Sequence, residues 1–173
     1  LTRAGGPLRQ FMLDQTRESD IATFVRISGG QGFATPEDVP FSILVPSFDD
    51  PDVIAGQGTV GLEIVEQATE CGATLDDVVV CTSGGGLVAG TALAVRALSP
   101  ATRIWSAEPA GHDDHRRSLD SGQRESNAPG TRSICDALLA PEPGVLTFAI
   151  NRQLLAGGLA VTDEEVRAAI AYA

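Results

Sequence analysis

The amino-acid sequence predicts an α/β domain built on a mostly parallel sheet with helices on both faces. Three observations lead to this prediction. The chain has 173 residues, of which 43% are hydrophobic, enough for one domain of ordinary size with its own core. Residues 77–81 form a short run rich in valine, typical of a strand buried on both faces of a parallel sheet. Strand-like and helix-like segments alternate through the rest of the chain.

Residues 1–47 give few clear signals apart from a short strand predicted at 41–45. Residues 47–52 are rich in Asp, Ser and Pro, which indicates a turn-rich connection. Residues 59–70 then follow a helical pattern, because apolar side chains recur on one face and glutamates lie opposite them. Gly72 is suited to end this helix, since glycine readily adopts the left-handed conformation found after a helix.

The rest of the chain continues the alternation. A tight glycine loop follows the first strand, and the nearly all-apolar segment after it predicts a buried helix. Thr162 and Glu165 have the spacing of a capping box, which predicts the start of the last helix. The expected elements are a strand at 77–81, a helix at 87–98, a strand at 103–108, a short helix at 113–121, a helix at 146–155, a strand at 159–161 and a helix from 163 to the end.

The chain carries a net charge of −11, and all of its 12 basic residues are arginine. An acidic surface repels phosphate backbones, so no nucleic-acid partner is expected. No apolar run approaches the ~18 residues of a membrane helix, so no membrane segment is expected either. Leu1 is not a methionine, and the last helix reaches Ala173 without a stop signal. Both ends therefore predict a part of a longer protein.

Three cysteines are present, Cys71, Cys81 and Cys135. Their number is odd, and no pair has the close spacing of a metal or redox motif. This pattern predicts reduced, mostly buried thiols in a cytoplasmic protein.

The glycine loop is the most informative feature for chemistry. Ser83-Gly84-Gly85-Gly86 connects a strand to a helix, and glycines allow backbone N–H groups to close around an anion. The helix that follows adds the positive end of its dipole, and Ser83 can add a hydroxyl donor, so the loop can hold a phosphate. A Cβ at Gly85 is expected to intrude on that anion. The alternatives are a turn that packs the helix close to the sheet, and a nucleotide site, although the GxGxxG pattern and a Walker lysine are absent.

A second cluster gathers acidic residues and histidines between 108 and 115. Its carboxylates are hard oxygen ligands, as Mg²⁺ and Ca²⁺ require. The alternatives are a solvated helix start, where acids are favourable, and a zinc site using His112 and His115, which would need further nitrogen or sulfur ligands.

Four segments resemble, in the same order, segments of threonine/serine dehydratases and serine racemases, which depend on pyridoxal phosphate (PLP). They are DDPDVIAGQGT at 49–59, SGGGLVAG at 83–90, EPAGHDD at 108–114 and PGTRSICDAL at 129–138. Ser83 and Ala137 stand where this family commonly has glycine. The resemblance covers residues 47–173 and implies the large-domain part of a fold type II PLP enzyme.

The resemblance implies how the chain is organised and what it binds. Residues 48–173 would be the large PLP-binding domain, truncated at its C-terminus, and residues 1–47 a divergent remnant of the small domain. A full-length parent would be a homodimer acting on a small amino acid. Mg²⁺ or Ca²⁺ would be bound by the carboxylates of Glu108 and Asp114 and the carbonyl of His112. The residues implied for the cofactor phosphate are Ser83, Gly84, Gly85, Gly86 and Leu87.

The reaction implied is β-elimination of water and ammonia from L-threonine or L-serine, giving a 2-oxo acid; a serine racemase is the close alternative. Family members bind PLP as a Schiff base on a lysine, and this chain contains no lysine. Arginine cannot replace it, because its guanidinium stays protonated. We therefore expect a fragment that is inactive alone and contains no catalytic residue. A non-catalytic remnant and a nucleotide-binding module remain as alternatives.

Overall fold

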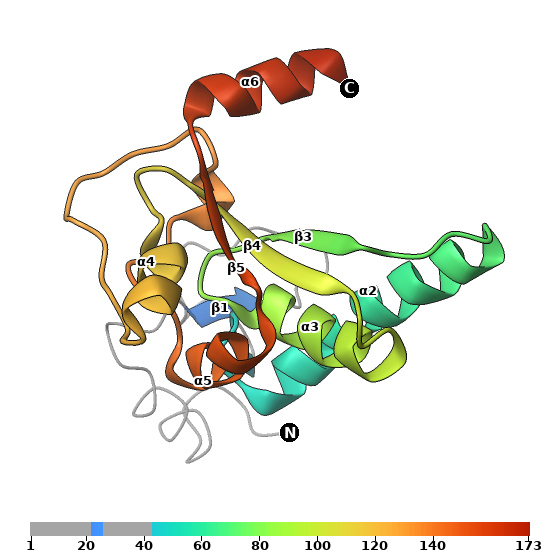
Figure 1. Cartoon of the computed structure of the whole chain (residues 1–173). Coiled ribbons are helices and arrows are strands. Elements are labelled where there is room, and N and C mark those ends of the chain that lie inside the picture. Colours follow the sequence, from blue (N-terminus) through green and yellow to red (C-terminus); the bar gives the residue numbers. More distant parts are fainter. Residues whose placement is uncertain (1–21, 26–42) are drawn as a thin grey trace, which may run out of the picture. The chain divides into compact units, whose positions relative to one another are not determined.

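The computed structural model describes residues 22–25 and 43–173 (Figure 1). The chain divides into two compact units, Leu1–Ser47 and Phe48–Ala173. In the first unit, β1 (Ala22–Val25) pairs antiparallel with β2 (Ile43–Pro46). β2 confirms residues 43–45 of the strand expected at 41–45, of which residues 41–42 lie outside the described residues; β1 was not predicted. The assignment of residues 1–47 to a remnant of a small domain stays a prediction.

The second unit is an α/β domain with a parallel sheet of strand order β3-β4-β5, which confirms the predicted class. Valine-rich β3 forms the first strand, and each crossover to the next strand contains helices (Figure 1). The strands are β3 (Asp77–Cys81), β4 (Arg103–Pro109) and β5 (Gly157–Val161). The helices are α2 (Pro51–Glu70), α3 (Gly86–Leu98), α4 (Asp114–Ser121), α5 (Val145–Leu154), α6 (Asp163–Tyr172) and the 3₁₀ helix η2 (Asp136–Leu138). From β3 onwards, strand and helix boundaries lie within two residues of those expected.

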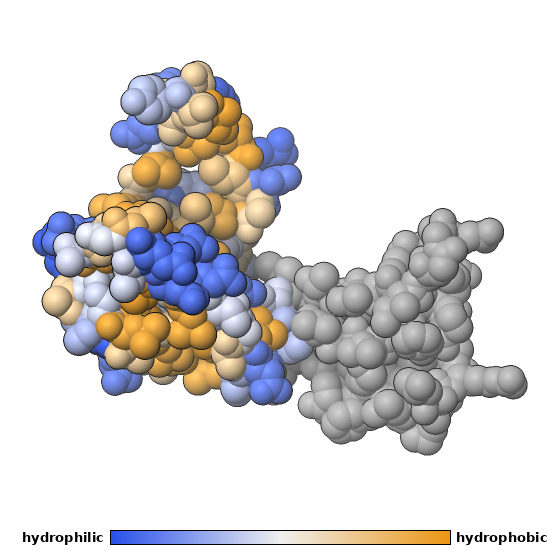
Figure 2. All heavy atoms as spheres, turned by 90° about the vertical axis from the view of Figure 1, so that its right-hand side faces the viewer, coloured by the Kyte–Doolittle hydropathy of each residue, from blue (hydrophilic) through white to orange (hydrophobic). Residues whose placement is uncertain are grey.

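The core lies between one face of the sheet and α3. Its buried members are Val78, Val80, Val88, Ala92, Val95 and Ile104. Residues of β3 alternate between buried and exposed, and Val79 on the opposite face is 56% exposed. The expectation that this strand is buried on both faces is therefore wrong for the described part of the chain. The helix α6 likewise has no buried residue, and Figure 2, with α6 at the top, shows hydrophobic residues open to solvent on it.

The first long helix begins eight residues earlier than the sequence pattern predicts. Asp50 caps α2 by accepting from the N–H groups of Asp52 and Val53, and Pro51 occupies the first turn. Gly58 and Gly61 lie where α2 crosses α3. A Cβ at Gly61 would lie 2.6 Å from the carbonyl oxygen of Thr91, so this crossing requires glycine.

A neighbouring acid, Asp49, caps a different helix. Its carboxylate accepts from the backbone N–H groups of Val145, Leu146 and Thr147, each at 2.9 Å. These N–H groups have no acceptor within α5, because they belong to its first turn. The pair of aspartates at 49–50 therefore joins the starts of two helices that are far apart in sequence.

We expect Asp49→Ala to lower the free energy of unfolding by about 1–2 kcal/mol, because the first turn of α5 loses its acceptor. Urea denaturation followed by circular dichroism measures this. Asp52→Ala is the matched control: Asp52 is also an exposed acid at a helix start, but its side chain accepts no bond from the chain's described residues. An equal loss in both variants would contradict the capping role.

The cysteine prediction is wrong in part. Cys71 and Cys81 are exposed and Cys135 is intermediate, and all three are free thiols. Cys71 follows the last residue of α2, and Cys81 lies on the exposed face of β3, so neither reaches the core. Among the described residues, no helix has both the length and the apolar character needed to cross a membrane.

Candidate functional site

The glycine loop lies at the carboxyl end of β3, where parallel sheets bind their ligands. β3 ends at Cys81 and α3 begins at Gly86. Gly85 is the N-cap of α3 and has φ +98° and ψ 1°. This left-handed conformation strongly favours glycine, which explains one of the glycines directly.

One side of the loop is held by α5 and the segment before it. The hydroxyl of Ser83 accepts from the N–H of Ala140 at 3.0 Å, which leaves its hydrogen available to donate. The Gly84 carbonyl accepts from Thr147 Oγ1 at 2.7 Å and from the N–H of Gly144 at 3.0 Å. These bonds fix the carbonyl groups on one side of the loop.

The other side of the loop presents backbone donors. A trans peptide directs its N–H opposite to its C=O, and no described peptide bond is cis. Within residues 43–173, the N–H groups of Gly84, Gly85, Gly86 and Leu87 donate to no backbone or side-chain acceptor. Unpaired donors at the start of α3, next to the positive end of its dipole, suit a phosphate.

Close packing also requires these glycines, although the neighbours are side chains and backbone outside the sheet. A Cβ at Gly84 would lie 2.3 Å from the ring of Phe48, and one at Gly86 would lie 2.8 Å from the Phe48 carbonyl oxygen. A Cβ at Gly85 would lie 2.7 Å from His115 and 2.9 Å from Asn151. It would therefore point into the protein, so the expectation that it intrudes on the anion is wrong.

A buried polar layer lies behind Gly85. The Asn151 amide nitrogen lies 3.2 Å from the Gly85 carbonyl oxygen and 3.0 Å from His115 Nε2. Burial lowers the pKa of His115 to about 4, so this ring is neutral at physiological pH. The sequence pattern did not single out Thr147 and Asn151. Their available signal was two polar residues four positions apart, each flanked by apolar residues on its N-terminal side.

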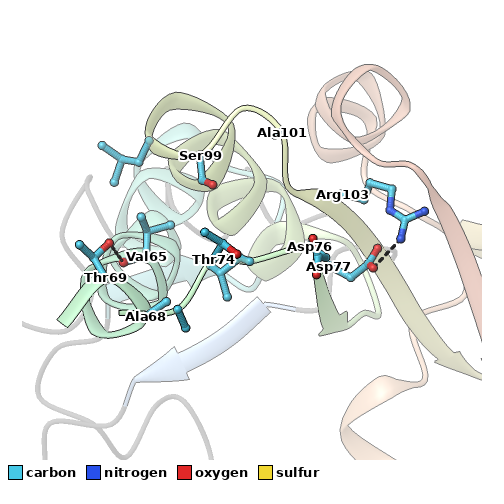
Figure 3. Close-up of a pocket in the computed structure, with 12 residues that line it drawn as sticks. Val65, Ala68, Thr69, Thr74, Asp76, Asp77, Ser99, Ala101 and Arg103 are labelled. Atoms are coloured by element: carbon cyan, nitrogen blue, oxygen red, sulfur yellow. Dashed lines mark hydrogen bonds and ion pairs between the residues drawn. The ribbon is translucent and has the colours of Figure 1, made fainter. Parts of the chain in front are cut away.

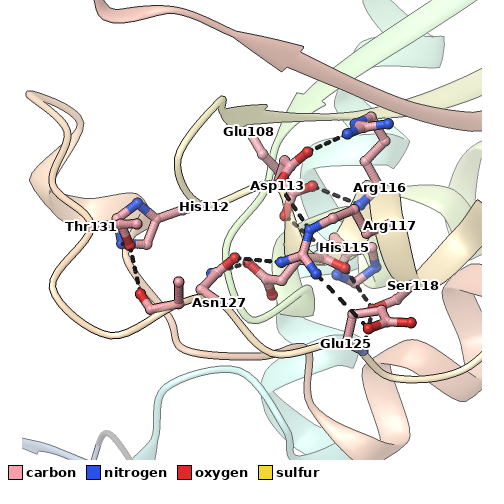
Figure 4. A network of polar contacts seen from close by, with 12 residues as sticks. Glu108, His112, Asp113, His115, Arg116, Arg117, Ser118, Glu125, Asn127 and Thr131 are labelled. Carbon is pink, nitrogen blue, oxygen red and sulfur yellow. Dashed lines mark hydrogen bonds and ion pairs between the residues drawn. The ribbon is translucent and has the colours of Figure 1, made fainter.

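The acidic cluster surrounds the start of α4 (Figure 4). Glu108 is fully buried near the end of β4 and accepts from the N–H groups of His115 at 3.0 Å and Arg116 at 2.8 Å. Asp114 is 1% exposed; one carboxylate oxygen accepts from Asn127, and the other has no partner among residues 22–25 and 43–173. The solvated helix start is therefore wrong for these two acids, because both are buried.

Burial strongly perturbs both carboxyl groups. It raises the pKa of Glu108 to about 8, against two backbone hydrogen bonds that favour the charged form. The neighbouring charge of Asp114 raises it further. Burial also raises the pKa of Asp114 to about 6, although its bond from Asn127 acts in the opposite direction. A cation between the two acids would relieve both the burial cost and the repulsion.

The histidines do not form a shared site. His112 Nε2 lies 3.2 Å from Thr131 Oγ1, whereas His115 Nε2 faces Asn151. Within the described ranges, no group of three His, Cys, Asp or Glu side chains is placed to hold a metal. The zinc alternative therefore lacks ligands. The set of Glu108, Asp114 and the His112 carbonyl, which needs only two side chains, stays a prediction.

A groove of about 630 Å³ lies at the opposite edge of the sheet (Figure 3). It is lined by the last turns of α2, the end of α3 and the starts of β3 and β4, where Asp77 and Arg103 form an ion pair between neighbouring strands. The groove is therefore separated from the glycine loop by the length of a strand.

Comparison with known proteins identifies the family. A sequence model described as "Pyridoxal-phosphate dependent enzyme" matches residues 37–173. The serine racemase of Dictyostelium discoideum is 40% identical over 128 residues, which are 73% of this chain and 38% of that protein. The catabolic L-threonine dehydratase TdcB of Escherichia coli (strain K12) is 36% identical over 125 residues, 72% of this chain and 36% of that protein. The chain thus spans little more than a third of these relatives.

Solved structures agree with the sequence comparison. The crystal structure of a threonine deaminase from T.th. matches with a TM-score of 0.69 and 43% identity, over 70% of this chain and 41% of that one. The serine racemase structure from D. discoideum matches with a TM-score of 0.63 and 39% identity, over 70% and 37%. Fold and sequence together confirm the resemblance: the chain belongs to the pyridoxal-phosphate dependent enzymes of fold type II.

Proposed function

We propose that the glycine loop binds the phosphate of PLP through the backbone of residues 83–87 and the hydroxyl of Ser83. The observation that supports this most directly is the row of unpaired N–H groups at the start of α3. When bound, PLP would supply the electron sink that stabilises a carbanion next to the substrate amine. The residues described here would anchor the cofactor by its phosphate.

The reaction we propose for the whole protein is the deamination of L-threonine or L-serine by β-elimination. Matches include an L-threonine dehydratase and an L-threonine ammonia-lyase, at 36% and 37% identity. Serine racemase is the second candidate, since a relative of that name reaches 40% identity. We further propose a cytoplasmic homodimer that takes a small amino acid, with neither nucleic-acid nor membrane partners.

The 173 residues contain no lysine, so we propose that they bind PLP without catalysing its chemistry. We expect calorimetry to show binding of inorganic phosphate and of PLP, and no tighter binding of NAD. The same chain, given PLP, should form no 2-oxo acid from threonine or serine.

Two results would contradict this proposal. Stoichiometric PLP trapped on a side chain by borohydride would show that another residue replaces the lysine. NAD binding tighter than PLP binding would favour a nucleotide-binding module instead.

We also propose that Glu108 and Asp114 bind Mg²⁺ or Ca²⁺ together with the His112 carbonyl. The support is chemical: two buried carboxyl groups with raised pKa values lie in one cluster, and one Asp114 oxygen has no partner in the described part of the chain. Such an oxygen is a hard ligand of the kind these ions prefer, and water would complete the shell.

Millimolar Mg²⁺ or Ca²⁺ is expected to raise the melting temperature, and Asp114→Asn should remove most of that increase. A hundredfold excess over Kd corresponds to about 2.7 kcal/mol of added stability. The increase should be larger at pH 8.5 than at pH 6, because both carboxyl groups must lose their protons to bind. Equal shifts in wild type and variant would place the ion elsewhere on this acidic surface.

A further inference from the structure

Two buried side chains of α5 hold the glycine loop from behind. Thr147 and Asn151 are four residues apart, so they lie on one face of the helix, and both are fully buried. Thr147 Oγ1 donates to the Gly84 carbonyl at 2.7 Å, and Asn151 Nδ2 donates to the Gly85 carbonyl at 3.2 Å. Each carbonyl also accepts from a backbone N–H group, Gly84 from Gly144 and Gly85 from Ala89, both at 3.0 Å, so each side-chain bond adds a second restraint to one peptide plane. The N–H groups of Gly85 and Gly86, which belong to those planes, are thereby directed away from α5.

The orientation of the Asn151 amide depends on His115. A carbonyl oxygen can only accept, so the Asn151 atom that faces Gly85 must be the NH₂ group. The same NH₂ group lies 3.0 Å from His115 Nε2, so Nε2 accepts and Nδ1 carries the ring hydrogen. Asn151 therefore uses one hydrogen for the loop and the other for His115.

This arrangement is costly for stability. Asn151 Oδ1 and His115 Nδ1 are both buried without a partner among the described residues. An unpaired buried polar atom is destabilising, and two apolar side chains of similar size would avoid the cost. The His115 ring packs edge-on against Phe148, but that contact does not need its polar atoms. The polar contact of the side-chain pair with the glycine loop is the bond from Asn151 to the Gly85 carbonyl.

We propose that Thr147 and Asn151, the latter oriented by His115, are positioning residues that set the glycine loop for phosphate binding. The inference rests on the proposed function, because it takes the loop to be a phosphate site. The three side chains act on the anion through the peptide planes at Gly84 and Gly85. His115 also connects α4, and with it the acidic cluster, to the glycine loop.

The test titrates the purified chain with inorganic phosphate and follows the amide signals of Gly85 and Gly86 by NMR. The double variant His115→Leu, Asn151→Leu replaces the polar pair with apolar side chains. We expect roughly fivefold weaker phosphate binding, the loss of about one hydrogen bond, together with an unchanged or higher melting temperature. A purely structural pair would give the reverse: a lower melting temperature and unchanged affinity.

Two further comparisons keep the test decisive. Thr91→Val is the matched control, because Thr91 Oγ1 is also buried and unpaired but lies on the side of α3 that faces α2. It should leave the affinity unchanged. Thr147→Val should weaken phosphate binding, whereas Thr147→Ser, which keeps the hydroxyl, should retain it. If the double variant does not fold, these two variants decide whether side chains of α5 position the loop for phosphate.

The possible failures can be told apart. If phosphate leaves the Gly85 and Gly86 signals of the wild type unchanged, the proposed function itself is overturned. If the wild type binds phosphate and both the double variant and Thr147→Val bind it equally well, the positioning role is overturned and the proposed function stands.

Discussion

Replacing Gly85 with valine is expected to abolish phosphate binding and to destabilise the domain. The backbone at this position has φ +98°, which a β-branched residue adopts only with strain. The new Cβ would also lie 2.7 Å from His115 and 2.9 Å from Asn151, both fully buried. Relief of these contacts requires the Gly85 peptide to turn, and the N–H groups that face the anion would turn with it. We expect a loss of stability on the order of 2–4 kcal/mol from strain and overpacking together.

The matched control is Gly72→Val. Gly72 also has a positive φ, of +67°, but no atom lies within 4 Å of a Cβ built there. The Gly72→Val variant therefore carries the backbone strain without the clash. Gly72 lies before β3 and the glycine loop after it, so the N–H groups of the loop stay in place. We expect about 1–2 kcal/mol of destabilisation and normal phosphate binding. Phosphate binding by Gly85→Val that equals that of Gly72→Val would contradict the loop geometry.

The elements from β3 onwards could be predicted because their signals are local. The valine run of β3, the apolar α3 and the capping box at Thr162 each depend on residues within one element. The start of α2 could not be predicted in this way. Gly56 and Gly58 disfavour a helix by propensity, whereas α3 packs closely against this part of α2 at Gly90, a contact between segments distant in sequence.

The same distinction applies to the candidate site. Ser83, the three glycines and Leu87 could be recognised from their order between a strand and a helix. Thr147 and Asn151 could not, because their role depends on α5 packing behind a loop more than sixty residues earlier. The capping of α4 by Glu108 could not be predicted either. Glu108 lies in a strand, and the turn after β4 brings the start of α4 back to its carboxylate.

We expect the stability of the domain to fall as the pH rises from about 6.5 to about 8, and Glu108→Gln to remove this fall. The pKa of Glu108 is about 8 in the folded protein and near 4.5 when exposed, so the folded state holds a proton that the unfolded state releases. The stabilisation from this proton is complete below pH 4.5 and is lost as the pH passes through 8. The largest slope for one proton is about 1.4 kcal/mol per pH unit, so the loss across this window is on the order of 2 kcal/mol.

Between pH 6.5 and 8, Glu108 contributes more to the change in stability than the other groups near α4 with shifted pKa values. Asp114 has a folded pKa of about 6, so most of its contribution is lost below the window. His115, with a folded pKa of about 4, is neutral in the folded state throughout. In the unfolded chain, the His115 ring still loses protons just above pH 6.5. This opposes the fall in the free energy of unfolding by only about 0.4 kcal/mol, and by the same amount in wild type and variant.

Urea denaturation without divalent ions, at pH 6.5 and 8.5, measures the difference in the free energy of unfolding. Glutamine at 108 keeps the size of the side chain and removes its titration. Glu63→Gln, on the exposed face of α2, is the control and should keep the fall of the wild type. A fall of the same size in Glu108→Gln would mean that the carboxyl of Glu108 is ionised across the whole window, its charge held by the N–H groups of His115 and Arg116.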